Sequence, residues 1–210
     1  PAASASDIEY LLRNVNRVLN VELGVADIDG VYAGLRPLIK GKEGATSDLS
    51  REHAVETTVP GFTTIAGGKY TTYRVMAEDA VNAAIADLQS RGLIDTVANS
   101  DTENIPLIGA TDLAEAQTRL QANAKSFGVS SEGVDHLLKR YGSMVGELIS
   151  ILKYRPELAA PIAGEVAGGP GYLRVEALYA VTHEGALHID DILTRRTHLS
   201  IETPDQGLAA

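Results

Sequence analysis

The fold is decided by residues 64–74, whose sequence is TIAGGKYTTYR. Two adjacent glycines follow a β-rich run, and a lysine, two threonines and an arginine come where a helix is expected to begin. Apolar side chains then recur at helical spacing before Gly92 stops the pattern, and they are Ala77, Val81, Ala84, Ile85 and Leu88. The stretch therefore predicts a strand-to-helix junction, where unpaired backbone N–H groups often approach an anion.

An antiparallel hairpin is expected immediately before this junction. Residues 52–59, EHAVETTV, alternate like an edge strand, and residues 62–67, FTTIAG, form a second β-rich run. Pro60-Gly61 between them predicts a tight turn. Further upstream, residues 27–35, DIDGVYAGL, predict a short strand that leads into Arg36-Pro37, where the proline favours an extended backbone.

The first predicted helix begins close to the N-terminus. Ser6 is the expected N-cap, and Glu9 three residues later completes a capping box. Asn20 or Gly24 is expected to end this helix. Its apolar face recurs at helical spacing through Ile8, Leu11, Leu12, Val15 and Leu19.

The second half of the chain predicts helices and no strand. A polar linker over residues 95–110 precedes a helix that opens at Thr111 or Asp112 and runs to about Ala124. Further helices are expected over residues 134–141, 145–152, 172–186 and 190–196, with Tyr172, Val175 and Tyr179 in the core. The predicted fold class is α+β: a small strand-containing domain over residues 1–92, followed by an all-α helical bundle over residues 93–210.

Composition narrows the function. The net charge of -10 argues against broad binding to nucleic acid, and the absence of cysteine excludes disulfides and thiolate metal sites. No apolar run approaches the roughly 20 residues that span a bilayer. The start, PAASASDIEYLL, is neither a signal peptide nor an initiator methionine, so we expect Pro1 to be a boundary within a longer protein or a processed end.

Known phosphate-binding motifs do not fit the glycine-lysine junction. A P-loop would need glycine at position 63 and serine or threonine at position 70, where Thr63 and Tyr70 stand. The Gly-x-Gly-x-x-Gly spacing of a dinucleotide fold is also missing. Two interpretations stay open. The junction presents helix N–H groups, Lys69 and Arg74 to an anion or an electron-rich ring, or it is a structural glycine turn with a surface lysine.

Taken in order, several stretches resemble FAD-dependent glycerol-3-phosphate dehydrogenases. The stretches are YAGLRPL, SREH, IAGGKYTTYRVMAE, PLIGA, LLKRYG, YLRVEALYAV-x-HE-x-A and DDILTRRT. The resemblance covers nearly the whole chain but not a whole enzyme, because the family's N-terminal glycine loop and its catalytic histidine have no counterpart here. The chain is therefore expected to be the C-terminal portion, with a flavin-domain remnant followed by the C-terminal helical domain.

The resemblance implies roles for individual residues. Arg36 would be catalytic and would contact the phosphate or hydroxyl of sn-glycerol 3-phosphate beside the flavin, with Lys69 and Arg51 near the same pocket. The cofactor-binding residues would be Gly67, Gly68, Lys69, Thr71 and Thr72, whose N–H groups would face the pyrimidine end of FAD. A helix N-terminus there stabilises the negative charge that develops on reduction.

The reaction that the resemblance implies is oxidation to dihydroxyacetone phosphate by hydride transfer to FAD, followed by electron transfer to a quinone. It also implies a cytoplasmic location, or a peripheral one on the inner face of the membrane. The isolated chain is expected to bind FAD poorly and to be inactive. Two alternatives stay open: a stand-alone module that binds a phosphorylated ligand or a protein, and an enzyme part that works with a second chain.

The remaining polar residues predict structure rather than chemistry. The spacing His183-Glu184 to His188 is one residue longer than the zinc-protease motif, so no metal site is expected. His53, His136 and His198 are predicted to be surface or capping residues, and Asp190-Asp191 to favour a helix N-terminus.

The helical half is expected to pack, to dimerise or to dock a partner. Residues 1–91 are expected to be less ordered or covered by self-association.

Overall fold

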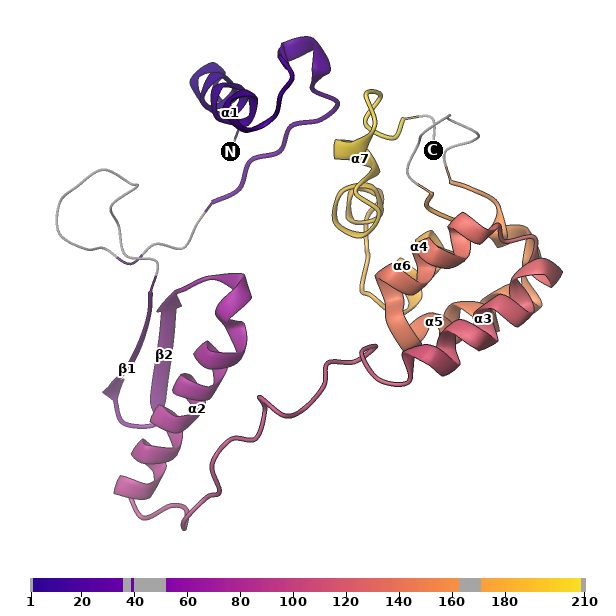
Figure 1. Cartoon of the computed structure of the whole chain (residues 1–210). Helices are drawn as coiled ribbons and strands as arrows, with labels where there is room; N and C mark the ends of the chain where they lie inside the picture. Colours follow the sequence, from indigo (N-terminus) through magenta and orange to yellow (C-terminus); the bar gives the residue numbers. More distant parts are fainter. Residues whose placement is uncertain (1, 36–38, 40–51, 163–170, 209–210) are drawn as a thin grey trace. The chain divides into compact units, whose positions relative to one another are not determined.

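A computed structural model describes residues 2–35, 39, 52–162 and 171–208 (Figure 1). The chain forms two compact units, of which one combines Pro1–Ala33 with Leu107–Ala210 and the other is Gly34–Pro106. A small sheet with one helix in the second unit and a set of helices in the first confirm the α+β class. The division of the sequence after residue 92 stays a prediction.

The smaller unit is the expected hairpin with its helix. Strands β1 (His53–Val59) and β2 (Phe62–Gly67) pair antiparallel, and helix α2 (Tyr73–Ser90) packs against them. Gly61 turns the chain with a φ of 82°, and its N–H group donates to Asp87 Oδ2 at 2.8 Å. This bond ties the tip of the hairpin to the far end of α2 (Figure 1).

Helices follow the linker in the order that the sequence predicts. Asp112 is the N-cap of α3, and Gly142 ends α4, as expected. The predicted helix over 172–186 is shorter in the structure, and the 190–196 helix is a π-helical turn over Asp191–Arg196. The bounds are α3 (Leu113–Phe127), α4 (Ser131–Tyr141), α5 (Val145–Tyr154), α6 (Arg174–Thr182) and α7 (Leu199–Glu202).

The hydrophobic core lies in these helices. All buried apolar side chains among the described residues lie at or after position 116. The expected core residues Tyr172, Val175 and Tyr179 are buried, with 5%, 0% and 4% of their surfaces exposed. The helical half therefore supplies its own apolar core.

The N-terminal segment differs from the prediction in two respects. Helix α1 (Ala5–Val18) begins two residues earlier than expected, because Ser4 is the N-cap and Asp7, rather than Glu9, completes the capping box. The strand predicted over residues 27–35 is wrong: a 3₁₀ turn, η1 (Val25–Asp27), precedes irregular backbone. An extended segment forms a strand only where a neighbouring strand pairs with it, and this segment has no such neighbour among the described residues.

Candidate functional site

The candidate site is the turn between β2 and α2, residues 67–72. Strand β2 ends at Gly67, and Gly67 and Gly68 both have positive φ, at 73° and 82°. A 3₁₀ turn, η3 (Tyr70–Thr72), then leads into α2. The predicted strand-to-helix junction is confirmed.

Gly67 is required by packing against the backbone, and Gly68 chiefly by its backbone conformation. A Cβ at Gly67 would lie 2.6 Å from the backbone oxygen of Glu52, and one at Gly68 would lie 2.5 Å from Met76 Sδ. Because both also have left-handed backbone, any other residue would be strained there. The glycine pair thus has a structural role whether or not a ligand approaches it.

Thr72 closes the turn on Lys69. Its hydroxyl donates to the Lys69 carbonyl oxygen at 3.0 Å, and its N–H group donates to the same oxygen at 3.0 Å. A 3₁₀ turn leaves its first N–H groups without partners inside the turn, and here these belong to Tyr70 and Thr71. Both residues are exposed, so the turn offers two backbone donors to a ligand.

Of the two described cationic side chains near the turn, Arg74 has polar partners and Lys69 has no ion-pair partner among the described residues. Arg74 donates to Glu78 Oε2 at 2.7 Å and to Thr102 Oγ1 at 3.3 Å, so its guanidinium joins α2 to the linker. Lys69 is exposed and has no ion-pair partner within the described part of the chain. Arg36 and Arg51, the other two expected substrate contacts, lie outside the described residues. Lys69 is therefore the available cation at the turn among the residues described.

The side chains of His53, His183 and His188 each lie close to a polar or charged partner. His53, predicted as a surface or capping residue, is half-buried, and its Nε2 lies 2.7 Å from Asp79 Oδ2. His183 Nδ1 lies 2.6 Å from the Thr182 hydroxyl, and the His188 ring lies 3.5 Å from Asp191. In the described ranges no three metal-ligating side chains come together.

One cluster in the helical half was missed from the sequence. His136 on α4 pairs with Glu176 on α6, and Tyr141 and Arg140 contact the same carboxylate. No local pattern could have paired these two residues, because His136 and Glu176 are 40 residues apart. The capping position of Glu176 in α6 was the available signal.

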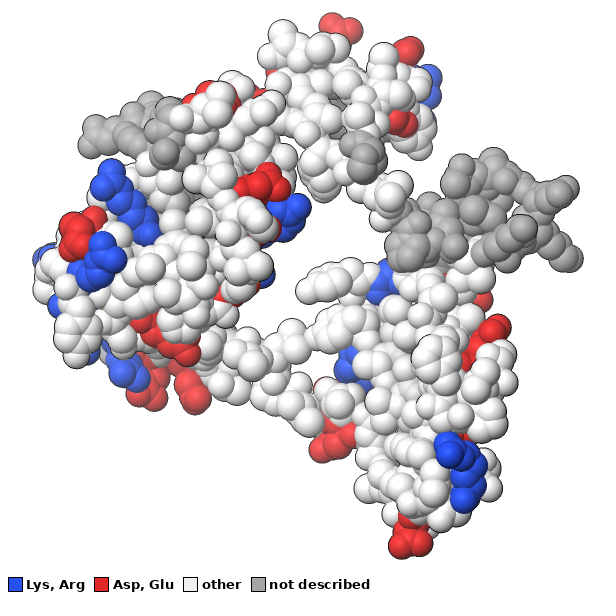
Figure 2. Space-filling view, turned by 180° about the vertical axis from the view of Figure 1, so that it is seen from behind, with Lys and Arg blue, Asp and Glu red and all other residues white. Residues whose placement is uncertain are grey.

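The described charges on one face of the molecule are mixed in sign. On the face shown in Figure 2, lysines and arginines are interspersed with aspartates and glutamates. None of the described helices is long and apolar enough to cross a membrane.

Known proteins resemble this chain over its full length. The family model for the C-terminal domain of alpha-glycerophosphate oxidase matches residues 100–210. A glycerol-3-phosphate dehydrogenase of Mycobacterium leprae is 50% identical over 209 residues, which are 100% of this chain and 34% of that protein. Glycerol-3-phosphate dehydrogenase 2 of Mycobacterium tuberculosis is 48% identical over 208 residues, 99% of this chain and 34% of its own length.

A more distant relative shows the same coverage. The mitochondrial glycerol-3-phosphate dehydrogenase of Arabidopsis thaliana is 29% identical over 226 residues, covering 100% of this chain and 34% of that protein. The chain thus spans about a third of the length of these relatives. Since the family model covers more than half of the chain, the chain belongs to the family of the C-terminal domain of alpha-glycerophosphate oxidase.

Proposed function

We propose that this chain is the C-terminal part of an FAD-dependent glycerol-3-phosphate dehydrogenase. The whole enzyme oxidises sn-glycerol 3-phosphate to dihydroxyacetone phosphate and passes the electrons to a quinone, either in the cytoplasm or on the inner face of the membrane. The observation that carries the proposal is the 50% identity over the whole chain to a protein of that name. The exposed turn at residues 67–72 supports it by offering donors and a cation at one place.

The turn fits one edge of a flavin. The N–H groups of Tyr70 and Thr71 begin η3, just before α2, so they would donate to the electron-rich pyrimidine edge, where the helix dipole adds favourable potential. Gly67 and Gly68 shape the approach to these donors, and Thr72 holds the turn closed. The sequence has no Gly-x-Gly-x-x-Gly loop for the pyrophosphate, so other parts of the enzyme would bind that end.

Positively charged side chains would bind the substrate. Lys69 would place its ammonium near the phosphate or the reacting hydroxyl, and Arg36 and Arg51 would contact the same substrate. FAD, when bound, supplies the acceptor for the hydride that leaves C2 as its hydroxyl becomes a ketone. A base in the preceding part of the enzyme would take the hydroxyl proton. The isolated chain, without that base and most flavin contacts, would be inactive.

Anaerobic reduction of the longer gene product tests this function. We expect a yellow protein whose flavin absorbance bleaches when sn-glycerol 3-phosphate is added. Lys69→Ala should raise the substrate concentration for half-maximal bleaching roughly tenfold or more, as expected for the loss of a charged contact to the substrate. Lys125→Ala, at an exposed lysine of the helical half, is the matched control and should have no effect.

Other results would favour the alternatives. A colourless product that still binds sn-glycerol 3-phosphate in calorimetry, and loses this binding in Lys69→Ala, would support a stand-alone binding module. A yellow protein that glycerol 3-phosphate does not reduce would contradict the proposed substrate.

A further inference from the structure

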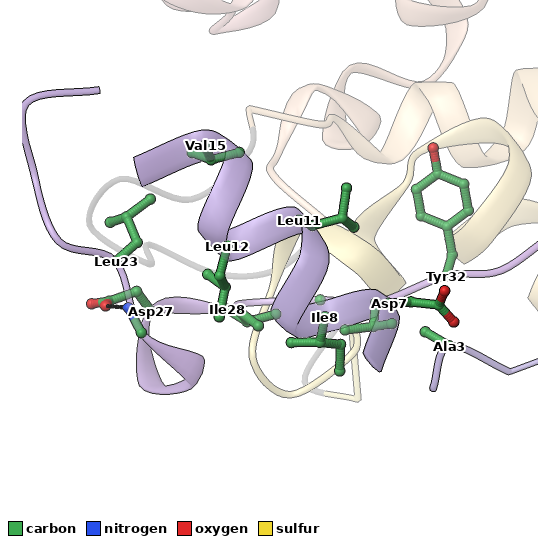
Figure 3. Close-up of a pocket in the computed structure, with 13 residues that line it drawn as sticks. Ala3, Asp7, Ile8, Leu11, Leu12, Val15, Leu23, Asp27, Ile28 and Tyr32 are labelled. Atoms are coloured by element: carbon green, nitrogen blue, oxygen red, sulfur yellow. Dashed lines mark hydrogen bonds between the residues drawn. The ribbon is translucent and has the colours of Figure 1, made fainter. Parts of the chain in front are cut away.

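Helix α1 and the segment after it enclose an apolar groove (Figure 3). Its volume is about 280 Å³. We name it the α1 groove, and the apolar side chains that line it include Ile8, Leu11, Leu12 and Val15 from the helix and Leu23, Ile28 and Val31 from the segment that follows.

The apolar side chains of α1 that line the groove are partly exposed, although a helix this short needs a packing partner for its stability. No residue of α1 is buried, and Leu11 and Val15 are 60% and 39% exposed. A helix of 14 residues is marginal in water, and its stability in a protein comes mainly from packing of its apolar face. Helix α1 makes no extensive contact with any other helix or strand that the structure describes.

The two carboxylates at the rim already accept hydrogen bonds from neighbouring residues. Asp7 Oδ2 accepts bonds from the Ser4 N–H group at 3.0 Å and from the Ser4 hydroxyl at 2.6 Å. Asp27 Oδ2 accepts from the Gly24 N–H group at 2.7 Å. No lysine or arginine of the described chain lines the groove. Its chemistry therefore suits an apolar protein surface rather than a polar or anionic small molecule.

The greater length of the relatives indicates which polypeptide would fill the α1 groove. The Mycobacterium leprae protein matches this whole chain, α1 included, over 34% of its own length. Because the matched family model describes a C-terminal domain, the matching part lies in the C-terminal region of that relative and a long stretch of polypeptide precedes it. A segment tethered just before α1 would have an effective concentration in the millimolar range. Such a segment needs little intrinsic affinity to fill the groove.

We propose that the α1 groove docks an apolar segment of the polypeptide that precedes this chain in the longer enzyme. The proposal rests on the proposed function only for the existence of that longer chain. Docking buries the exposed faces of Leu11 and Val15 and stabilises α1, which otherwise frays. Helix α1 is then one of the elements that join this chain to the rest of the enzyme.

Hydrogen exchange in the longer gene product and in this chain alone tests the docking. The amides of residues 5–18 should exchange at least about a hundredfold more slowly in the longer protein, as expected when a fraying helix becomes part of a cooperative unit. The protection should not change on dilution, because the occupant is tethered. Exchange that is equally fast in the folded longer protein overturns the proposal, as does protection that disappears on dilution, which would indicate a second copy.

A pair of neighbouring variants locates the docking surface. Leu11 and Tyr10 are almost equally exposed, at 60% and 58%, but Leu11 lines the groove and Tyr10 does not. Tyr10 instead lies beside Arg13, whose guanidinium carbon is 5.8 Å from the ring centre. Leu11→Asp should reduce the added protection at least about tenfold because it places a charge in an apolar contact, whereas Tyr10→Asp should retain it. Equal effects of the two variants overturn the proposal.

These readouts separate docking from catalysis. A longer protein that protects α1 but does not oxidise glycerol 3-phosphate contradicts the proposed function and retains the docking. An active enzyme whose α1 amides exchange freely contradicts the docking and retains the function. If Leu11→Asp prevents folding, the comparison of the two wild-type proteins still decides.

Discussion

Nε2 of His136 lies 2.9 Å from Oε1 and 3.1 Å from Oε2 of Glu176, a carboxylate with 1% of its surface exposed. The same carboxylate accepts from the Leu173 N–H group at 2.6 Å and from the Tyr141 hydroxyl at 3.2 Å. Arg140 Nε lies 3.5 Å away. Because Glu176 also caps the start of α6, one buried side chain joins α4 to α6.

Glu176→Ala should therefore destabilise the helical half strongly. The substitution leaves the Leu173 N–H group and the Tyr141 hydroxyl without an acceptor, and it leaves the positive charge of Arg140 uncompensated. Breaking a buried pair of this kind costs about 3 to 5 kcal/mol. Urea unfolding followed by circular dichroism at 222 nm measures the change.

Two controls make this prediction specific. Glu157→Ala removes a fully exposed carboxylate that pairs with Arg155 at 2.9 Å and should leave the unfolding midpoint unchanged. Glu176→Gln keeps one acceptor oxygen and should fall between wild type and Glu176→Ala. If Glu176→Ala unfolds at the wild-type urea concentration, the cluster is not a structural link.

The buried tyrosines of the helical half predict a loss of stability in alkali. Burial raises the pKa of Tyr172 to about 12, and the negative charge of Glu202 adds to the shift. Burial also raises the pKa values of Tyr141 and Tyr179. A raised pKa means that the folded state retains a proton that the unfolded state loses. The stabilisation is complete below about pH 10, the ordinary tyrosine pKa, and is lost as the pH rises towards 12.

As the pH rises from about 10 towards 12, each of these buried tyrosines should lower the free energy of unfolding by up to about 1.4 kcal/mol per pH unit. Urea unfolding at pH 9, 10 and 11, with tyrosinate absorbance recorded in parallel, measures this slope. Tyr172→Phe should reduce the slope, whereas Tyr154→Phe, at a residue 88% exposed, should leave it unchanged. A flat stability profile up to pH 11 in the wild type would contradict the prediction.

Local signals predicted most of the secondary structure. Pro60-Gly61 specified the hairpin turn, and Gly142 stopped α4 because it has positive φ where a helix must end. Helical periodicity identified α2 and α5 because their apolar stripes are set within a few turns of the chain. In each case the determining residues are close together in sequence.

Structure that depends on distant residues could not be predicted in this way. The strand predicted over residues 27–35 does not form, because no strand pairs with this segment among the described residues. The contact between His136 and Glu176 depends on how α4 and α6 pack. The substrate roles predicted for Arg36 and Arg51 rest on the resemblance, because neither arginine stands in a local pattern that is specific for a substrate contact.

The N-terminus of α1 offers a direct comparison between the predicted and observed caps. Ser4, not Ser6, is the N-cap: the Asp7 N–H group donates to Ser4 Oγ at 3.3 Å, and the Ser4 N–H group donates to Asp7 Oδ2. Ser4→Ala should therefore cost the helix about 1 kcal/mol, whereas Ser6→Ala should cost much less. Cα chemical shifts of residues 5–9 measure the helicity. A greater loss of helicity in Ser6→Ala than in Ser4→Ala would show that Ser6 is the N-cap, as the sequence predicted.

The glycines of the candidate site should respond to substitution as structural residues. Gly67→Ala meets both the left-handed backbone, φ 73°, and the Glu52 carbonyl oxygen at 2.6 Å. Because that oxygen belongs to the backbone, relief requires the hairpin to move. We expect a loss of about 2 to 4 kcal/mol, measured from the exchange of the amides that pair β1 with β2.

Gly92→Ala is a control for Gly67→Ala, because it introduces the strain of a left-handed backbone without a steric clash. Gly92 also has positive φ, 69°, but a Cβ there would meet nothing within 4 Å, so only the conformational cost of about 1 kcal/mol applies. In the longer enzyme, Gly67→Ala should lower thermal stability and flavin content together, because the fold of the turn fails first. A variant that keeps the wild-type melting temperature but loses flavin would instead show that Gly67 is needed for the approach of the cofactor itself.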